Sequence, residues 1–263
     1  NYWKITFLFL IFLIVLFNIL LLFLKEISFS DKEKEKKKLQ NKINSKFFKQ
    51  DRFSIFLSWF FSTILGPIFS FFKKNGLKIG IALLAFLFLY KIGEAFLGRM
   101  SILFYKEIGF SKIDIGIFSK GIGWLTTICF TLLGGFFTIK IGLFRSVFIA
   151  GIFMAITNLF FALLYWSGKN YAVFLLAVIL DDIAAAFATV AFVAFISFLV
   201  DRNYTATQYA LLVSIGTLGR TTLASSSGSL VDFLDGKWDI FFILTTLMII
   251  PSLIILYYLN KKI

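Results

Sequence analysis

The sequence predicts an all-α protein that crosses a membrane several times. Its 263 residues are 59% hydrophobic, its mean hydropathy is +0.91, and it contains only two prolines. This composition is far too apolar for a soluble domain of this size. A bilayer core of about 30 Å requires about 20 apolar residues in a helix. About seven segments meet that requirement: 6–24, 77–97, 115–138, 145–166, 172–200, 209–233 and 239–259.

The first of these segments lies close to the start of the sequence, which opens at Asn1 instead of a methionine. No small-residue cleavage site follows its apolar run, so we interpret it as a membrane span and not as a signal peptide. The missing methionine suggests a piece of a longer chain. We expect three parts: residues 1–25 as the last span of one bundle, 26–76 as a basic cytoplasmic loop with an interfacial helix, and 77–263 as a six-span bundle.

The distribution of positive charge predicts how the spans are oriented. A net charge of +13 would favour nucleic acid as a partner in a soluble protein, but ten of the 27 basic residues lie between Lys25 and Arg52. If that interval is cytoplasmic and the spans alternate, 18 Lys and Arg residues fall on the cytoplasmic side and six on the outer side. This arrangement follows the positive-inside rule. We therefore expect a cytoplasmic C-terminus and no nucleic-acid partner.

The segment 53–72 is long enough to span the membrane, but basic residues flank it on both sides. If it crossed, one basic flank would have to lie outside, against the positive-inside rule. We therefore interpret it as an interfacial helix that is broken at Gly66-Pro67, with Trp59 at the depth of the lipid headgroups.

Cysteine and histidine usage limits the chemistry that the chain can perform. The chain has one cysteine, Cys129, and no histidine, which excludes disulfide frameworks, Cys/His zinc sites and histidine catalysis from these residues. The string "DDIAA" at 181–185 is similar to the start of a metal-binding aspartate motif, so a membrane enzyme is an alternative. Adjacent residues on a helix point about 100° apart, however, and no third acid follows at helical spacing. We expect no enzyme, no metal and no cofactor.

Four of the spans carry ionisable residues within their apolar runs, and three do not. Ionisable groups inside a membrane nearly always face the bundle interior or a water-filled cavity. Four spans are therefore expected to border a shared space, whereas 6–24, 145–166 and 239–259 face lipid or pack outside. At a helical rise of about 1.5 Å per residue, the aspartates and the arginine fall near the bilayer midplane. The ionisable residues are Lys91, Glu94, Lys120, Asp181, Asp182 and Arg220.

Several strings resemble the muropeptide permease (AmpG) family of the major facilitator superfamily, and are less closely similar to the acetyl-CoA transporters. In that superfamily, twelve spans form two six-helix bundles with a substrate path between them. On this alignment the spans here would be the sixth to the twelfth, so five spans of the first bundle are absent. The three uncharged spans coincide with the superfamily's peripheral helices. The strings are "YKIGEAF" at 90–96, "EIGFSKIDIGIFSKGIG" at 107–123, "GLFR" at 142–145 and "ATQYALLVSIGTLGR" at 206–220.

The resemblance implies proton-coupled import of anhydromuropeptides, which are cell-wall recycling products, across the bacterial inner membrane. The implied partners are a small anionic substrate, protons, the lipid bilayer and a separate or upstream N-terminal half. The family commonly has aspartate where this chain has Glu94. The basic residues expected to bind substrate carboxylates are Lys91, Lys120 and Arg220, and the acids expected to take and release protons are Glu94, Asp181 and Asp182.

Plainer interpretations exist for the same residues. Lys91 and Glu94 stand three apart on one helix face, where they could simply neutralise each other, and Arg220 could pair with Asp181 or Asp182 across helices. The alternative functions are a split-gene half or a remnant that inserts without transporting, and a transporter of acetyl-CoA or another anionic solute.

Overall fold

The computed structural model describes residues 2–23, 65–201 and 204–262. Helices account for nearly all of these residues, and no strand occurs among them. The predicted all-α polytopic fold class is confirmed, because the described part of the chain contains six helical stretches long and apolar enough to cross a membrane. Residues 53–64 of the ambiguous segment lie outside the described residues.

Two units of the chain are described separately, residues 1–62 and 63–263. The first contains helix α1 (Tyr2–Leu22), whose described side chains are almost all exposed and apolar. The amide of its polar residue Asn18 donates a hydrogen bond to the Ile14 carbonyl of the same helix, at 2.8 Å. A helix whose polar side chain is hydrogen-bonded to its own backbone is suited to hydrocarbon surroundings.

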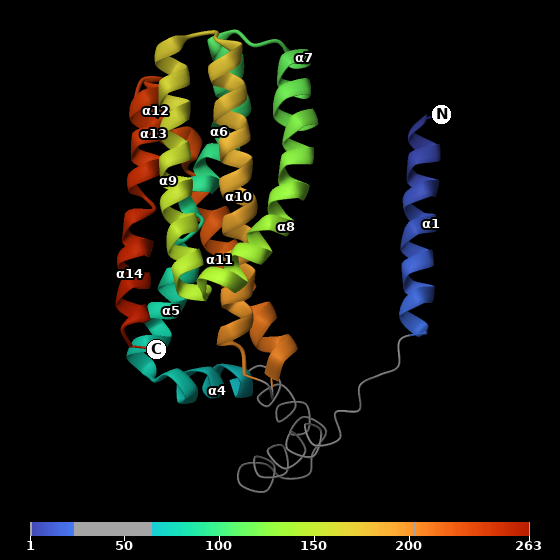
Figure 1. Ribbon diagram of the computed structural model, residues 1–263, viewed down its shortest axis with the longest axis vertical. Coiled ribbons are helices and arrows are strands. Elements are labelled where there is room, and N and C mark those ends of the chain that lie inside the picture. The colour runs from blue at the N-terminus through green and yellow to red at the C-terminus, as the bar shows by residue number, and fades with distance from the viewer. Residues whose placement is uncertain (1, 24–64, 202–203, 263) are drawn as a thin grey trace, which may run out of the picture. The chain divides into compact units, whose positions relative to one another are not determined.

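The second unit begins with α4 (Gly66–Asn75), which lies across one end of the helices that follow (Figure 1). The helix starts where the break was predicted, because Pro67 is tolerated in the first turn of a helix but not in its interior. Phe71 is buried, Phe69 is 71% exposed, and two lysines occupy the last turn. This described part of the segment has the amphipathic character of an interfacial helix.

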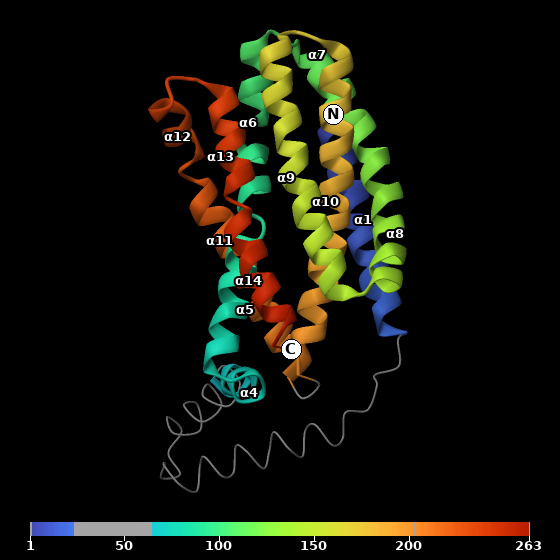
Figure 2. The same ribbon diagram turned by 60° about the vertical axis from the view of Figure 1, so that its left-hand side comes forward.

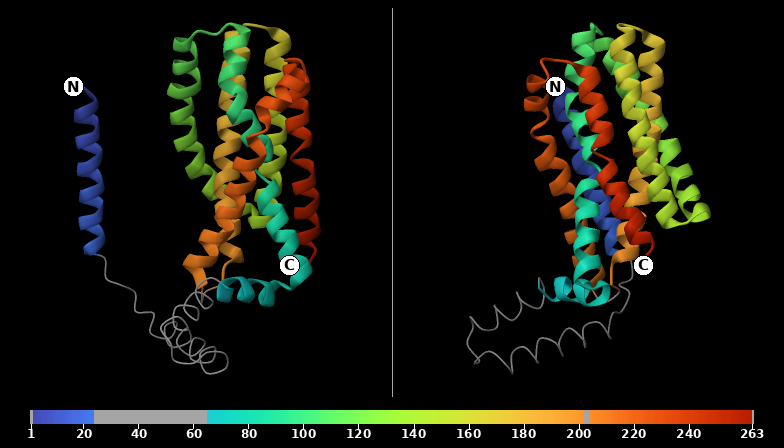
Figure 3. Two further views of the ribbon diagram at one scale, coloured as in Figure 1. Left: turned by 180° about the vertical axis from the view of Figure 1, so that it is seen from behind. Right: turned by 90° about the vertical axis from the view of Figure 1, so that its left-hand side faces the viewer.

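Three of the predicted spans are each built from two helices. Figure 3 shows the second unit from two further sides. Transporters tolerate irregular backbone inside the membrane where it is buried in protein or lines a cavity. The first interruption falls at Tyr90 and Lys91, and the others fall at 225–226 and 248–249. The pairs are α5 (Leu77–Leu89) with α6 (Ile92–Ile108), α11 (Thr205–Ala224) with α12 (Ser227–Phe233), and α13 (Trp238–Leu247) with α14 (Ile250–Asn260).

The remaining spans are continuous. α7 (Lys112–Ile115), the π-helix η2 (Gly116–Ile122) and α8 (Gly123–Ile141) follow one another without a gap, and they precede α9 (Leu143–Ser167) and α10 (Tyr171–Leu199).

The predicted span 209–233 differs from the other six. Its helices α11 and α12 pack along α5 and α6 (Figure 2), but they are not among the stretches that are apolar and long enough to cross by themselves. The physical reason lies in its sequence, because Arg220 and several hydroxyl side chains lower its hydropathy and α11 ends at Ala224. A segment of this kind needs neighbouring helices to cover its polar face.

Aromatic rings build much of the core of the second unit. Tyr90 is fully buried, stacks on Phe192 with ring centroids 5.2 Å apart, and donates a hydrogen bond from its hydroxyl to the Val147 carbonyl at 2.8 Å. A second cluster surrounds Phe104 and Trp238, whose ring centroids are 5.2 Å apart. These contacts fix the helices on both sides of the break between α5 and α6.

Glycines on α11 bring this helix against α5. A Cβ atom at Gly219 would overlap the Phe88 carbonyl oxygen, and one at Gly216 would lie 3.4 Å from the Leu87 carbonyl oxygen, both on α5. Small residues at such spacings allow membrane helices to approach closely. Phe88 lies at the end of α5, directly before the break that contains Lys91, so a shift of its backbone would also move Lys91.

We expect Gly219→Ala to destabilise the second unit by about 1–3 kcal/mol, because the new methyl group overlaps backbone and not a flexible side chain. The measurement is the apparent melting temperature of the chain purified in detergent. Gly98→Ala is the matched control, since a Cβ there meets no atom within 4 Å, and it should leave the melting temperature equal or slightly higher. Equal melting temperatures for the two variants would contradict this packing.

Candidate functional site

The break between α5 and α6 places an ion pair inside the bundle. Lys91 occupies the N-cap position of α6 with φ −102° and ψ 16°, and Glu94 lies in the first helical turn. The Lys91 Nζ atom is 3.0 Å from Glu94 Oε2, and their side chains are only 11% and 16% exposed. An acid in the first turn is also favoured by the helix dipole. The two residues therefore neutralise each other in the structure, which is the plainer of the interpretations given for them from the sequence.

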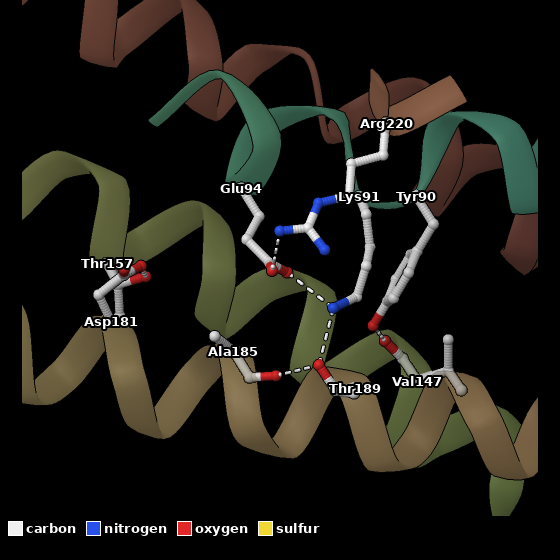
Figure 4. A network of polar contacts seen from close by, with 9 residues as sticks. All are labelled: Tyr90, Lys91, Glu94, Val147, Thr157, Asp181, Ala185, Thr189 and Arg220. Atoms are coloured by element: carbon white, nitrogen blue, oxygen red, sulfur yellow. Dashed lines mark hydrogen bonds and ion pairs between the residues drawn. The ribbon is translucent and has the colours of Figure 1, made fainter. Parts of the chain in front are cut away.

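Arg220 reaches the same carboxylate from α11 (Figure 4). Its Nη2 atom lies 3.8 Å from Glu94 Oε1, and its side chain is 51% exposed. The ion pair of Arg220 is therefore with Glu94 on α6. The alternative considered from the sequence, a pair with Asp181 or Asp182 on α10, is not the one that forms. At this distance and exposure the attraction is weak, because half-exposed pairs contribute little. Glu94 thus has one buried cationic partner and one accessible cationic partner.

Helix α10 contributes a third side of the site. The Lys91 ammonium donates a hydrogen bond to Thr189 Oγ1 at 2.7 Å, and that hydroxyl donates to the Ala185 carbonyl at 2.7 Å. Asp181, Ala185 and Thr189 are spaced four residues apart, so they share one face of α10, as Figure 4 shows. Thr189 was not predicted from the sequence, although its spacing of eight residues from Asp181 places both on one helix face.

The two adjacent aspartates point toward different helices. Asp181 accepts a hydrogen bond from the buried Thr157 hydroxyl of α9 at 3.5 Å. Asp182 lies against Gly123 of α8, where a Cβ atom would overlap its carboxylate. This divergence is what helical geometry predicted for neighbouring residues. The pair therefore does not form a chelating site, and no cluster of three or more acids or cysteines suited to a metal occurs among the described residues.

The structure brings some of the six predicted site residues together and separates others. Lys91, Glu94 and Arg220 are in direct contact, and Asp181 lies on the same α10 face as Thr189, which binds Lys91. Asp182 faces α8, and Lys120 lies in η2, with its side chain outside the described part of the structure.

Helix α8 has a wide exposed apolar face, although the span to which it belongs also contains Lys120. Only three described residues of α8 are buried, Gly123, Gly134 and Thr138. The span 115–138 was predicted to border a polar space, yet α8 carries a wide apolar face. This face consists of Trp124, Leu125, Ile128, Leu132, Leu133, Phe136 and Ile139, each between 46% and 87% exposed.

Several known proteins are similar in sequence to this chain. No family model matches it. The chain is 31% identical over 263 residues to a putative transporter AmpG 4 of Rickettsia felis, matching all of this chain and 58% of that protein. It is 34% identical over 206 residues to the putative transporter AmpG 4 of Rickettsia conorii, covering 78% of this chain and 48% of that protein.

The anhydromuropeptide permease of Escherichia coli K12 is 29% identical over 194 residues, covering 73% of this chain and 38% of that protein. The chain is a homologue of the AmpG transporters. The resemblance found in the sequence strings is thereby confirmed, and the chain spans about half the length of the curated relatives it matches. These AmpG relatives are named as transporters and a permease, which points to a membrane protein that is not an enzyme.

We expect Glu94→Gln to destabilise the chain by about 3 kcal/mol, because it leaves the buried Lys91 ammonium without its acid. Arg220→Gln should cost less than about 1 kcal/mol, since its half-exposed pair contributes little. The apparent melting temperatures in detergent test this order. Lys91→Met combined with Glu94→Gln should recover part of the loss, because it removes both buried charges. A larger loss for Arg220→Gln than for Glu94→Gln would contradict the assignment of Lys91 as the principal partner.

Proposed function

We propose that this chain forms the C-terminal part of a proton-coupled secondary transporter. The transporter imports anhydromuropeptides across the bacterial inner membrane, and the C-terminus of the chain is cytoplasmic. The observation that carries the proposal is the placement of Glu94 between a buried lysine and a half-exposed arginine at a helix break. The names of the AmpG relatives support the substrate class.

The three charges can couple a proton to an anionic substrate. Protonation of Glu94 removes its negative charge and releases Arg220, whose guanidinium then binds a substrate carboxylate. Loss of the proton to the other side of the membrane restores the Glu94 carboxylate, which competes with the substrate for Arg220. Lys91 stays in position next to Glu94 through both states, because its ammonium remains hydrogen-bonded to Thr189. Alternating exposure of such a site is the mechanism of secondary transport.

The other predicted residues have supporting roles in this scheme. Asp181 lies about two helical turns along α10 from Thr189, the residue that binds Lys91. Asp181 and Asp182 provide further positions that a proton can occupy. Lys120 on η2 is proposed to attract the second charge of an anionic substrate. Both roles rest on residue type and on position along the helices.

A transport path needs a second wall, which we propose is an N-terminal bundle encoded upstream or as a separate chain. This proposal is supported by the chain matching about half the length of its relatives. We propose the domain division 1–25, 26–76 and 77–263 on the same basis. A remnant that inserts without transporting is the alternative that a transport measurement decides.

The transport test uses a complete permease, made by joining this chain to the preceding coding sequence or to the N-terminal part of the Rickettsia felis relative. We expect it to accumulate labelled anhydromuropeptide when a proton gradient is applied. Arg220→Gln should abolish uptake while leaving membrane insertion intact, because it removes the substrate-binding cation. Arg99→Gln, on an exposed position of α6, is the control and should transport normally.

Glu94→Gln separates coupling from binding in the same assay. It should lose gradient-driven accumulation but retain exchange of external for internal substrate, since a permanently neutral side chain no longer carries a proton. Full uptake by Arg220→Gln would remove this arginine from the mechanism. No uptake by the unsubstituted permease favours the remnant, and equal uptake of acetyl-CoA favours the wider class of anionic solutes.

A further inference from the structure

A groove on the surface of the second unit uses none of the residues of the charged site. It has a volume of about 190 Å³ and lies between the first turns of α9 and the last turns of α14. Its lining includes Arg145, Phe148 and Ile149 of α9, and Leu256, Tyr257 and Asn260 of α14.

Polar and apolar groups follow the same order along both walls. On α9, Arg145 stands at the helix end, and Phe148 and Ile149 lie one turn further in. On α14, Asn260 ends the helix and Tyr257 lies one turn earlier. One turn corresponds to about 5 Å along the helix axis. The surface of the groove is almost wholly apolar, and the polar residues Arg145 and Asn260 stand at one end of it. This arrangement matches the order of acyl chain and headgroup in a lipid.

The charge at this end of the groove is positive. Arg145 is exposed, and it forms no ion pair with a carboxylate of the described residues. The Lys261 ammonium lies 4.6 Å from the centroid of the Tyr257 ring, and that ring is 56% exposed. Two cations with no acidic partner among residues 2–23, 65–201 and 204–262 therefore stand next to the groove, and they would attract an anionic headgroup.

We propose that this groove binds one anionic phospholipid from the leaflet that surrounds this end of the bundle. Its phosphate lies between Arg145 and Lys261, and one acyl chain lies along Phe148, Ile149 and Tyr257. A soluble phosphate would satisfy the two cations but would leave the apolar surface of the groove uncovered. Basic pockets between membrane helices are suited to anionic lipids because charge and apolar burial act together.

The test measures lipids that stay bound to the purified full chain in detergent, by native mass spectrometry with added phosphatidylglycerol or phosphatidylcholine. We expect phosphatidylglycerol to bind preferentially. Arg145→Gln combined with Lys261→Gln should weaken its binding about ten- to thirtyfold, because each cation near a lipid headgroup contributes a few-fold or more. The matched control is Arg99→Gln with Lys237→Gln, which removes two exposed cations elsewhere and should change binding less than twofold.

A second variant tests the apolar surface of the groove while keeping the charges. Ile149 is 44% exposed, so Ile149→Trp places its larger ring in the groove and not in the core, and it should also weaken phosphatidylglycerol binding. An excess of glycerol 3-phosphate should fail to displace the lipid. Equal binding by the charge variant and its control would overturn the proposal, and so would displacement by glycerol 3-phosphate, which would mark a site for soluble phosphate.

Discussion

The cost of holding the Glu94 carboxylate inside the membrane determines the arrangement around it. An isolated charge in a low-dielectric interior is strongly unfavourable, so it must be paired or neutralised. Two separate helices supply cations: Lys91 from the break before α6 and Arg220 from α11. A third helix orients Lys91 through Thr189. The carboxylate therefore couples three parts of the bundle that are distant in sequence.

The backbone geometry of the bundle serves this contact. Arg220 directly follows Gly219, the residue that packs against the Phe88 carbonyl of α5. A side chain at position 219 would push α11 outward, and the guanidinium would lose its reach to Glu94. The break at Lys91 has a similar role, because Tyr90 is anchored by its ring stack and by its bond to Val147 while the chain changes direction. Close packing and a local irregularity thus place two cations at one acid.

The spans and the charged residues of the site could be predicted from the sequence. The contacts between helices could not, because they depend on how the helices cross in three dimensions. Length and hydropathy located the spans, and the cost of charge in hydrocarbon selected Lys91, Glu94 and Arg220. The partner of Arg220 was not predictable, since pairing across helices depends on their crossing and register. The breaks at Lys91 and at 225–226 were also missed, because neither contains a proline. The exposed face of α8 depends on what covers it, which composition does not specify.

The central requirement is that the half-exposed Arg220 side chain borders water, whereas the exposed apolar face of α9 faces lipid. It is tested most directly by the reactivity of single cysteines toward a membrane-impermeant, water-soluble maleimide. The cysteines are introduced in a complete permease that carries Cys129→Ser and is embedded in vesicles. Arg220→Cys should react at least tenfold faster than Ile156→Cys, on the exposed apolar face of α9, and added anhydromuropeptide should slow it. Equal and slow reaction at both positions would place Arg220 against lipid and contradict the account.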